Sequence, residues 1–385
     1  MTEAAKLRDV VSAIEGLYPP RWADPGDDAI GLIVGEPDAD VRRMLFAVDP
    51  VRAVVDEAIA SHADLIVAHH PLLFRPVSSV AANTPKGRVI HDLISHGIAL
   101  YAAHTNADSP ARGVCEAMAS ALGLVDIKPL RADPVDPLDK IVTFVPTEHA
   151  QKMIDTLAGA GAGAIGDYDR CAFVTAGEGT FRPGPAASPT IGVPGEVEVV
   201  DECRVEMVLA RDDRAAVIAA LCSAHPYEEP AFDVFELAAW SADRGTGRIG
   251  ELSPPRSLRE FVDTVLRALP STAVGARVSG DLERRVRRVA LVGGAGDFML
   301  DAAGHAGVDA YVTSDLRHHP AAEFREYDDA PALVDVPHWA AEWTWLPVAS
   351  RALRDELAER GFVIDSQVSR ICTDPWNHQA SHGAR

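Results

Sequence analysis

The chain has 385 residues, and its 36 Lys and Arg against 57 Asp and Glu give a formal net charge of −21. At about 150 residues per domain, this length predicts two or three domains. The composition, 47% hydrophobic and 24% charged, is close to that of ordinary globular proteins and permits a sizeable core. The strong acidity argues against nucleic acid or an anionic membrane surface as the main partner, because both bind basic surfaces.

The cysteines and the apolar runs indicate where the protein works. An odd number of cysteines with no CxxC pair argues against a disulfide framework or a thiolate zinc site, and favours a reducing compartment. Residues 1–20 mix charges into a helical pattern without an apolar stretch, and no run approaches 18 apolar residues. We therefore expect no signal peptide, no membrane span and a cytoplasmic location. The five cysteines are Cys115, Cys171, Cys203, Cys222 and Cys372.

The first section, residues 1–128, alternates short apolar runs with helical patterns. Runs rich in Val, Ile, Leu and Ala predict strands buried on both faces at residues 44–48, 65–68 and 98–103. Helical patterns follow at residues 51–61 and 86–96. This alternation is typical of an α/β fold with a mainly parallel sheet.

The second section, residues 129–249, opens with the Asp- and Pro-rich stretch 131–139. The order β-α-β-β-α-β that follows is typical of a ferredoxin-like α+β module with its own small core. The expected strands are 140–146, 171–175, 197–209 and 231–237, with helices at 148–160 and 212–224 and a Gly- and Pro-rich loop at 180–193.

The third section, residues 250–385, returns to the pattern of the first. Apolar runs predict strands at 289–292, 310–313 and 332–336. The polar tail after Asp374 predicts a frayed terminus.

Histidines and carboxylates follow four of the predicted strands. In open α/β sheets, ligands bind outside the carboxyl ends of the strands, so we expect these side chains to converge. The groups are His69 and His70 after 65–68, His104 and Asp108 after 98–103, Asp315, His318 and His319 after 310–313, and His338 and Glu342 after 332–336.

Imidazole and carboxylate together suit Zn, Mn, Fe or Co. His338 and Glu342 are four residues apart and present both groups on one helical face. The adjacent His69 and His70 can diverge at a strand-to-loop turn. Together with Asp108, these four residues make five candidate ligands. Five ligands hold two metal ions when a carboxylate or a water bridges the two ions, and a two-metal site activates water. The sequence therefore predicts hydrolysis.

Simpler interpretations of single residues stay open. Asp108 suits the cap of a helix that begins near Pro110. Glu342 suits a solvated helix position. For His91 and His96, on the intervening helix, we favour ordinary surface histidines.

Two glycine patterns match a dinucleotide fingerprint without its context. Residues 245–250 and 161–166 both fit GxGxxG, but neither lies between a strand and a helix, so neither predicts a dinucleotide site. We interpret residues 245–250 as a hinge back into the main fold. Residues 289–296 have the context of a phosphate-touching loop, but a tight turn is favoured. For Trp339, Trp343 and Trp345 we favour a packed face over a platform for a base.

These residues resemble the GTP cyclohydrolase 1 type 2 homologues, also called Nif-three-like dinuclear-metal-centre proteins, over nearly the whole chain. The chain departs from the family pattern at Ala29, Ser314 and Pro337, which leaves the five metal-binding candidates in place. The resemblance rests on Asp28-Ala-Ile-Gly31-Leu32 with Gly35, Ala68-His-His-Pro71, His104-Thr-Asn-Ala-Asp108, Val292-Gly-Gly-Ala-Gly296, Thr313-Ser-Asp315 with His319, and His338 with Glu342. The segments His225-Pro-Tyr-Glu-Glu-Pro230 and 245–252 resemble the PII- or CutA-like module of the long form.

The resemblance implies a split α/β domain of two similar halves, three-layered with mixed or mainly parallel sheets, and an inserted ferredoxin-like, PII/CutA-like domain. It implies a toroidal homohexamer, a trimer of dimers, with metal sites facing a central cavity. Two divalent metal ions per subunit are implied, held by His69, His70, Asp108, His338 and Glu342. His104 and His319 are implied nearby as proton-transfer groups.

The family name implies opening of the guanine imidazole ring of GTP with release of formate. Metal-activated water would attack C8 while a histidine moves protons. Two other functions stay open: a two-metal phosphodiesterase or phosphatase, and a non-catalytic regulatory or metal-handling hexamer whose insert gates its cavity. For Arg75, Lys86 and Arg317 we favour solvated surface charges over phosphate contacts.

Overall fold

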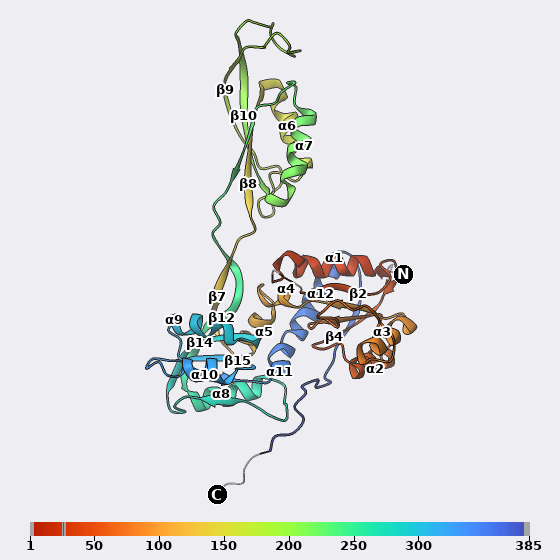
Figure 1. Ribbon diagram of the computed structural model, residues 1–385, viewed down its shortest axis with the longest axis vertical. Helices are drawn as coiled ribbons and strands as arrows, with labels where there is room; N and C mark the ends of the chain where they lie inside the picture. The colour runs from red at the N-terminus through yellow and green to blue at the C-terminus, as the bar shows by residue number, and fades with distance from the viewer. Residues whose placement is uncertain (1–3, 25, 27, 381–385) are drawn as a thin grey trace. The chain divides into compact units, whose positions relative to one another are not determined.

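The computed structural model describes residues 4–24, 26 and 28–380. The chain forms two compact units, Met1–Asp133 with Asp243–Arg385, and Pro134–Ala242. The domain boundaries expected near residues 128 and 249 fall inside strands β7 (Val125–Pro134) and β12 (Ser241–Ser257), in which the unit boundaries also lie. The fold is mixed α/β with several sheets, and each unit is described by itself (Figure 1).

The first unit contains a five-stranded sheet of order β17-β4-β5-β6-β2. Strands β17, β4, β5 and β6 are parallel, and β2 is antiparallel to β6. The three strands predicted in the first section are therefore confirmed as neighbours. Their bounds are β2 (Gly31–Val34), β4 (Arg43–Ala47), β5 (Leu65–Ala68), β6 (Ala99–Ala102) and β17 (Asp365–Val368).

The central strands of this sheet are buried on both faces, as their continuous apolar sequences predict. Leu65 and Val67 pack into the largest core of the unit, whereas Ile66 and Ala68 pack into a second core. The second core lies under helices α2 (Arg52–Ala60) and α3 (Pro85–His96), which cover that face (Figure 1).

The six-stranded sheet has the order β13-β16-β15-β14-β12-β7. Strands β14, β15 and β16 are parallel, whereas β13 and β12 run antiparallel to their neighbours. One face packs on α9 and α10, and the other joins the largest core with α5 and α8. The bounds are β13 (Arg277–Ser279), β14 (Arg285–Ala295), β15 (Ala310–Ser314), β16 (Ala332–Asp335), α5 (Val114–Ala121), α8 (Leu258–Ala268), α9 (Leu300–His305) and α10 (His318–Phe324).

The two chain sections of this unit exchange elements. Helix α12 (Leu346–Glu359) and β17 come from the end of the chain, but they pack on α1 (Leu7–Leu17) and β4 of the first section. Strand β7, from the first section, lies at the edge of the six-stranded sheet beside β12. The helical pattern expected over residues 1–20 is thus α1, and residues 1–3 lie outside the described residues. Smaller elements are β1 (Ala5–Lys6), β3 (Asp40–Val41), α4 (Thr105–Asp108), α11 (His338–Trp343) and the 3₁₀ turns Pro20–Trp22 and Asp297–Met299.

Two glycine segments differ from the prediction. Residues 245–250 lie inside the 17-residue strand β12 rather than in a hinge, and residues 248–251 pair with β14. Gly293 and Gly294 lie inside β14 rather than in a tight turn. The register of β14 against β15 shifts between Leu291 and Ala295, so the pair occupies a bulge.

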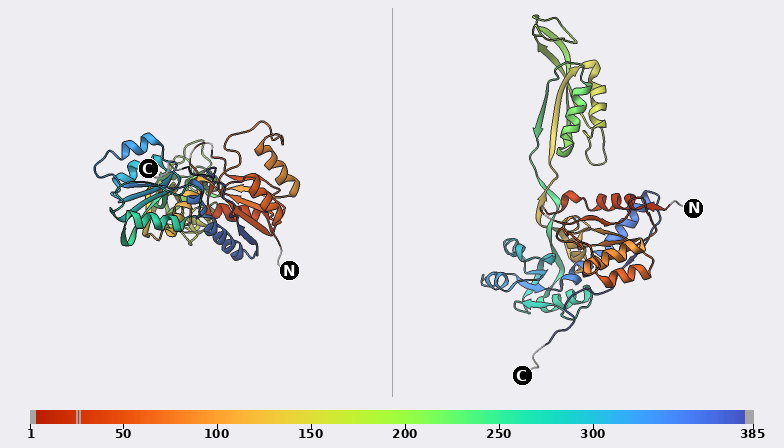
Figure 2. Two further views of the ribbon diagram at one scale, coloured as in Figure 1. Left: turned by 90° about the horizontal axis from the view of Figure 1, so that it is seen from below. Right: turned by 45° about the vertical axis from the view of Figure 1, so that its right-hand side comes forward.

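The second unit is a four-stranded antiparallel sheet of order β11-β8-β10-β9. Helices α6 and α7 cover one face and form a separate core with β8 and β10 (Figures 1 and 2). The predicted order of strands and helices is present. The bounds are β8 (Leu138–Pro146), α6 (Ala150–Gly159), β9 (Phe173–Phe181), β10 (Glu198–Ala210), α7 (Arg214–Ala224) and β11 (Phe232–Glu236), with 3₁₀ turns at Thr147–His149 and Arg211–Asp213.

A buried carboxylate ties β8 of this unit to α7. Asp139 accepts hydrogen bonds from Arg214 at 2.6 Å and from Arg211 at 3.1 Å. The hydrogen bond from the Arg214 guanidinium holds the pKa of Asp139 below its ordinary value of 3.8, because its effect outweighs the opposite effect of burial. Because the pKa is lower in the folded state, this contact stabilises the fold above pH 3.8 and is lost as the pH falls through the folded pKa.

We expect Asp139→Asn to lower the free energy of unfolding by about 2 kcal/mol at pH 7, the scale of a charge-assisted hydrogen bond. The difference from the wild type should shrink below pH 3.8. Urea unfolding of the full chain at pH 7 and pH 3 measures both quantities. Asp233→Asn, at an exposed position of β11, is the matched control. A difference that stays constant with pH would contradict the role of the Asp139 charge.

Two further expectations concern cysteines and membranes. All five cysteines are free thiols. Among the described residues, no helix is both long enough and apolar enough to cross a membrane.

Candidate metal centre

Histidines from three strand ends meet in the first unit. His69 and His70 directly follow β5, His104 precedes α4, and His338 begins α11. One ring nitrogen each of His69, His70 and His104 lie within 4.8 Å of one another. The same holds for ligand atoms of His70, His338 and Glu342, so His70 belongs to both groups. The convergence predicted for four strand ends therefore occurs for the histidines of three of them.

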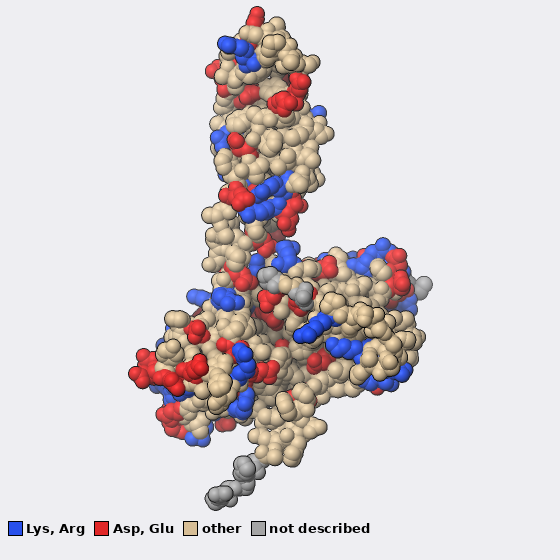
Figure 3. Space-filling view, in the orientation of Figure 1, with Lys and Arg blue, Asp and Glu red and all other residues tan. Residues whose placement is uncertain are grey.

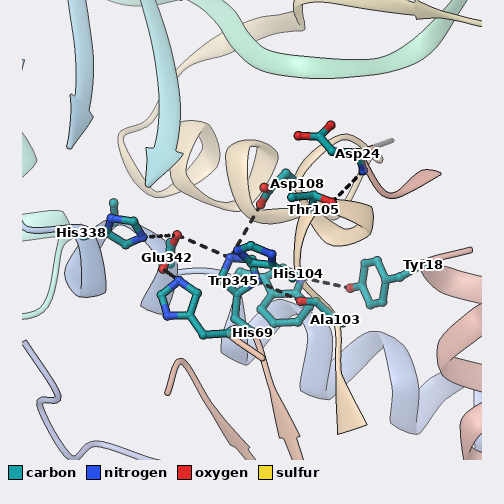
Figure 4. Close-up of polar contacts among 12 residues, drawn as sticks. Tyr18, Asp24, His69, Ala103, His104, Thr105, Asp108, His338, Glu342 and Trp345 are labelled. Carbon is teal, nitrogen blue, oxygen red and sulfur yellow. Dashed lines mark hydrogen bonds and ion pairs between the residues drawn. The ribbon is translucent and has the colours of Figure 1, made fainter. Parts of the chain in front are cut away.

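Glu342 is the carboxylate at the middle of the cluster. It is 3% exposed, so it is not the solvated helix residue considered as an alternative. Its Oε1 lies 2.8 Å from His338 Nε2 and 3.4 Å from His69 Nε2, and its Oε2 lies 3.1 Å from His70 Nε2 (Figure 4). One carboxylate thus reaches three imidazoles.

Asp108 faces the same cluster from the end of α4. Its Oδ1 lies 3.8 Å from His69 Nε2 (Figure 4). The helix that follows Pro110 is α5, and its N-cap is Gly113, so Asp108 is not the cap considered as an alternative. Asp108 Oδ1 and Glu342 Oε2 are buried without a hydrogen-bond partner among the described residues. Buried, unpartnered carboxylate oxygens are costly unless a cation binds them.

All four histidines are oriented by an oxygen on the far side of the ring. The Nδ1 atom of His69 lies 2.9 Å from the carbonyl oxygen of Ala103, and that of His70 lies 2.8 Å from Asp49 Oδ1. The Nδ1 atoms of His104 and His338 lie 2.7 Å from Asp28 Oδ1 and from Asp315 Oδ2, respectively. A carbonyl or carboxylate oxygen accepts, so each Nδ1 carries the proton and donates. The other ring nitrogen, Nε2, is then free to face the cluster. A hydrogen bond donated by Nδ1 is the usual way in which a metal-binding histidine is oriented. The donor set therefore fits divalent metal ions.

The charges of the cluster are strongly coupled. Burial acts to raise the pKa of Glu342, but His70 and His69 outweigh it and hold the pKa well below its ordinary value. Burial acts to lower the pKa of His70, but Glu342 and Asp49 raise it to about 10. Burial and the Glu342 charge raise the pKa of Asp108 to about 8. A metal ion that binds His70 and Asp108 would displace their protons.

Gly294 closes the cluster from the strand β14. A Cβ at this position would lie 2.6 Å from Glu342 Oε1 and 3.3 Å from His338 Nε2. The φ angle of Gly294 is +75°, which also disfavours a side chain. Gly294 therefore permits close approach of the backbone to Glu342 and His338, which neither of the two sequence interpretations anticipated.

A cavity of about 700 Å³ opens beside the cluster. His70 and His338 form part of its wall, together with Asp315 and Trp376. Residues 375, 376 and 378–380, which belong to the tail expected to be frayed, line this cavity, and the Thr373 hydroxyl donates to Asp49. Residues 381–385 lie outside the described part of the chain. A small molecule has room next to the histidines.

The remaining sequence candidates lie outside the cluster. His319 is exposed on α10 and its ring packs on His318; no contact within the described residues joins it to the centre. His91 and His96 are exposed, as expected. Trp345 is fully buried and Trp339 nearly so, which confirms a packed face.

Three supporting carboxylates were missed as site residues. Asp28 is only a mark of the family resemblance, and Asp315 is expected at a strand end but is not among the proposed ligands or proton-transfer groups. Asp49 was not considered, although it follows the strand β4 closely, and a search of every strand end would have found it. Asp315 also adopts a φ of +55°, which is a strained conformation for a residue other than glycine. In this conformation its carboxylate accepts the hydrogen bond from His338.

Comparison with known proteins places the chain among relatives of matching length. The family model Duf34/NIF3 (NGG1p interacting factor 3) matches residues 5–375. A Mycobacterium tuberculosis protein named GTP cyclohydrolase 1 type 2 homolog is 47% identical over 379 residues, 97% of each chain. A Bacillus subtilis protein of the same name is 36% identical and covers 98% of this chain and 99% of its own.

Solved structures agree with this assignment. A Bacillus cereus protein related to NIF3 superposes with a TM-score of 0.80 at 34% identity, covering 97% of this chain and 99% of its own. A Staphylococcus aureus protein gives a TM-score of 0.82 at 27% identity, covering 98% of this chain and all of its own. Sequence, fold and cluster together show that the chain belongs to the Duf34/NIF3 family.

Proposed function

We propose that this protein binds two divalent metal ions and is a metal-dependent hydrolase that resembles GTP cyclohydrolase 1 type 2. The observation that carries the proposal is the common orientation of four histidines around two buried carboxylates, each with an oxygen that accepts no hydrogen bond from the described residues. The names of the curated relatives support the cyclohydrolase reaction, the opening of the imidazole ring of GTP with release of formate.

Five side chains are the proposed metal ligands. Four of them come from two groups that share His70 and are connected by Glu342, and the fifth, Asp108, faces His69 at 3.8 Å. Bound there, two metal ions supply an activated water and stabilise negative charge that develops on the substrate. The ligands are His69, His70, Asp108, His338 and Glu342.

His104 is the proposed proton-transfer group. Its Nδ1 donates to Asp28, whose other carboxylate oxygen accepts from the Thr105 backbone amide at 3.2 Å. Burial acts to raise the pKa of Asp28, but His104 and Thr105 hold it below its ordinary value, so the carboxylate stays ionised. An ionised partner fixes the orientation and the tautomer of the His104 ring. His319 is exposed on α10, away from the cluster, so we assign it no role in proton transfer.

The finer architecture belongs to the same proposal. Two similar α/β halves form the metal-binding domain, and the Pro134–Ala242 unit is its PII/CutA-like insert. The expected homohexamer, a trimer of dimers, and the cytoplasmic location stay predictions.

The function is tested on protein purified without chelator or affinity metal. We expect about two metal ions per chain by elemental analysis, and formate released from GTP by the same sample. Release of phosphate without formate would replace the cyclohydrolase with a phosphatase. Absence of metal after reconstitution with Zn, Mn, Fe or Co would overturn the proposal.

His104→Gln separates proton transfer from metal binding. We expect the variant to retain the wild-type metal content and to lose activity by about 100-fold or more, the usual contribution of a general acid or base. Elemental analysis and formate release measure the two quantities. Because a ring nitrogen of His104 lies within 4.8 Å of those of His69 and His70, loss of metal would instead make His104 a ligand. His96→Gln, on the surface of α3, is the matched control.

A further inference from the structure

A second cavity, of about 500 Å³, also borders the metal centre. Its wall comes from three segments: the residues after β4, the residues after β5 and the beginning of α3. His70 and Asp49 line this cavity and the larger one described above. The two cavities therefore share the His70–Asp49 pair, and one ligand has room to extend from the metal centre into the second cavity.

The wall of this second cavity is basic in a chain of net charge −21. Arg52, Lys86 and Arg88 line it, and Figure 3 shows Lys and Arg side chains over the region of α2 and α3. Arg52 is paired with Asp56 at 3.2 Å and with Asp92 at 3.6 Å. Lys86 and Arg88 are exposed and form no ion pair with any described residue. Two cations are thus available to an anion.

An aromatic ring lies between these cations and the histidines. Phe74 is 49% exposed, and Lys86 Nζ lies 5.8 Å from the centre of its ring. On the other side, the ring centre of Phe74 lies 6.3 Å from that of His70 and 5.7 Å from that of His104. An apolar contact surface therefore connects the reacting end of the site to its basic end.

We propose that this second cavity is the phosphate subsite of the metal centre. The substrate class is a phosphorylated small molecule, whose reacting part lies at the metal cluster while its phosphate oxygens contact Lys86 and Arg88. Arginine suits this role because its planar guanidinium donates two parallel hydrogen bonds to phosphate, and lysine adds a compact charge. The proposal rests on the proposed function, because it assigns the remote part of the substrate of that same site.

The experiment measures binding rather than turnover. Metal ions themselves bind phosphate, so the full chain is stripped with a chelator, dialysed and titrated calorimetrically with GTP and with guanosine. We expect the wild type to bind GTP at least about 10-fold more tightly than guanosine, because charge-assisted hydrogen bonds form only with the phosphates. Lys86→Ala with Arg88→Ala should remove this preference and leave guanosine binding unchanged.

A matched double variant controls for the loss of two positive charges. Arg351→Ala with Arg354→Ala changes two exposed arginines of α12 that do not line the cavity. We expect this variant to bind GTP like the wild type. Equal binding of GTP and guanosine by the wild type, or the same loss in both double variants, would overturn the phosphate subsite.

The outcomes also separate this inference from the proposed function. If GTP binding depends on Lys86 and Arg88 but the metal-loaded wild type releases no formate, the phosphate subsite stands and the cyclohydrolase fails. If formate is released and the KM for GTP is unchanged in the Lys86 and Arg88 double variant, the cyclohydrolase stands and the phosphate subsite fails.

Discussion

Glu342→Gln is expected to lower the metal content from about two ions per chain to less than one, and to abolish hydrolysis. The carboxylate approaches His69, His70 and His338 at 2.8 to 3.4 Å, so it belongs to one group of ligand atoms and reaches His69 of the other. An amide keeps the shape of the side chain but removes the negative charge, and only one of its two polar atoms accepts. Changes in the surroundings of a metal ligand cost 10–100-fold in affinity, so we expect the loss of a ligand to cost at least about 100-fold.

The measurement is elemental analysis after reconstitution, with circular dichroism to check that the fold is intact. Glu359→Gln, at the exposed end of α12, removes the same charge away from the cluster and should keep the wild-type metal content. Two metal ions per chain in the Glu342→Gln variant would show that Glu342 is not a ligand and does not connect two metal ions.

The convergence of the histidines was predictable because it follows from the topology of parallel sheets. Strands such as Leu65–Ala68 are uniformly apolar, so their position in a sheet is clear from the sequence, and the residue after each carboxyl end is then located. His69, His70 and His338 were found in this way. The spacing of His338 and Glu342 placed both on one face of α11 without knowledge of the tertiary structure.

The supporting groups were not predictable, because they come from residues far away in the chain. His104 is oriented by Asp28, 76 residues earlier, and His338 by Asp315, 23 residues earlier. Such pairs depend on tertiary packing, for which a single sequence contains no periodic pattern. Gly294 is a similar case, because its importance lies in the 2.6 Å that would separate a Cβ from Glu342.

Two strands, β12 and β17, were also beyond sequence reasoning. Strand β12 contains Gly, Pro and charged residues, which weaken a strand prediction, and it pairs with β14. Strand β17 pairs with β4 of the first section, and the preceding helix α12 packs on α1. In both cases long-range contacts outweigh weak local preferences.

A fully buried arginine in β12 holds the segment that follows Asp108. Arg248 is 0% exposed, and all five of its N–H groups donate. Nε donates to Glu116 at 2.6 Å, Nη1 to the carbonyl oxygens of Gly245 and Gly247, and Nη2 to those of Ser109 and Pro110, all four at 2.8 Å. The residue thereby connects the second chain section to the end of α4.

Arg248→Lys is expected to lower the free energy of unfolding by about 3–5 kcal/mol, the usual cost of breaking a buried charged network. Lysine keeps the charge but has three N–H donors on one atom, so at least two of the five acceptors lose their partner. Each buried acceptor left without a partner costs about 1–3 kcal/mol. Because Ser109 directly follows Asp108, we also expect weaker metal binding.

Urea unfolding of the metal-stripped chain measures the stability, and titration with Zn²⁺ of the folded variant measures the affinity. Arg354→Lys, at an exposed position of α12, makes the same chemical change where no buried acceptor depends on it, and should be neutral. A stability loss below about 1 kcal/mol in Arg248→Lys would mean that lysine or water replaces the guanidinium. A large loss of stability with unchanged Zn²⁺ affinity in Arg248→Lys would show that Arg248 stabilises the fold but does not position Asp108.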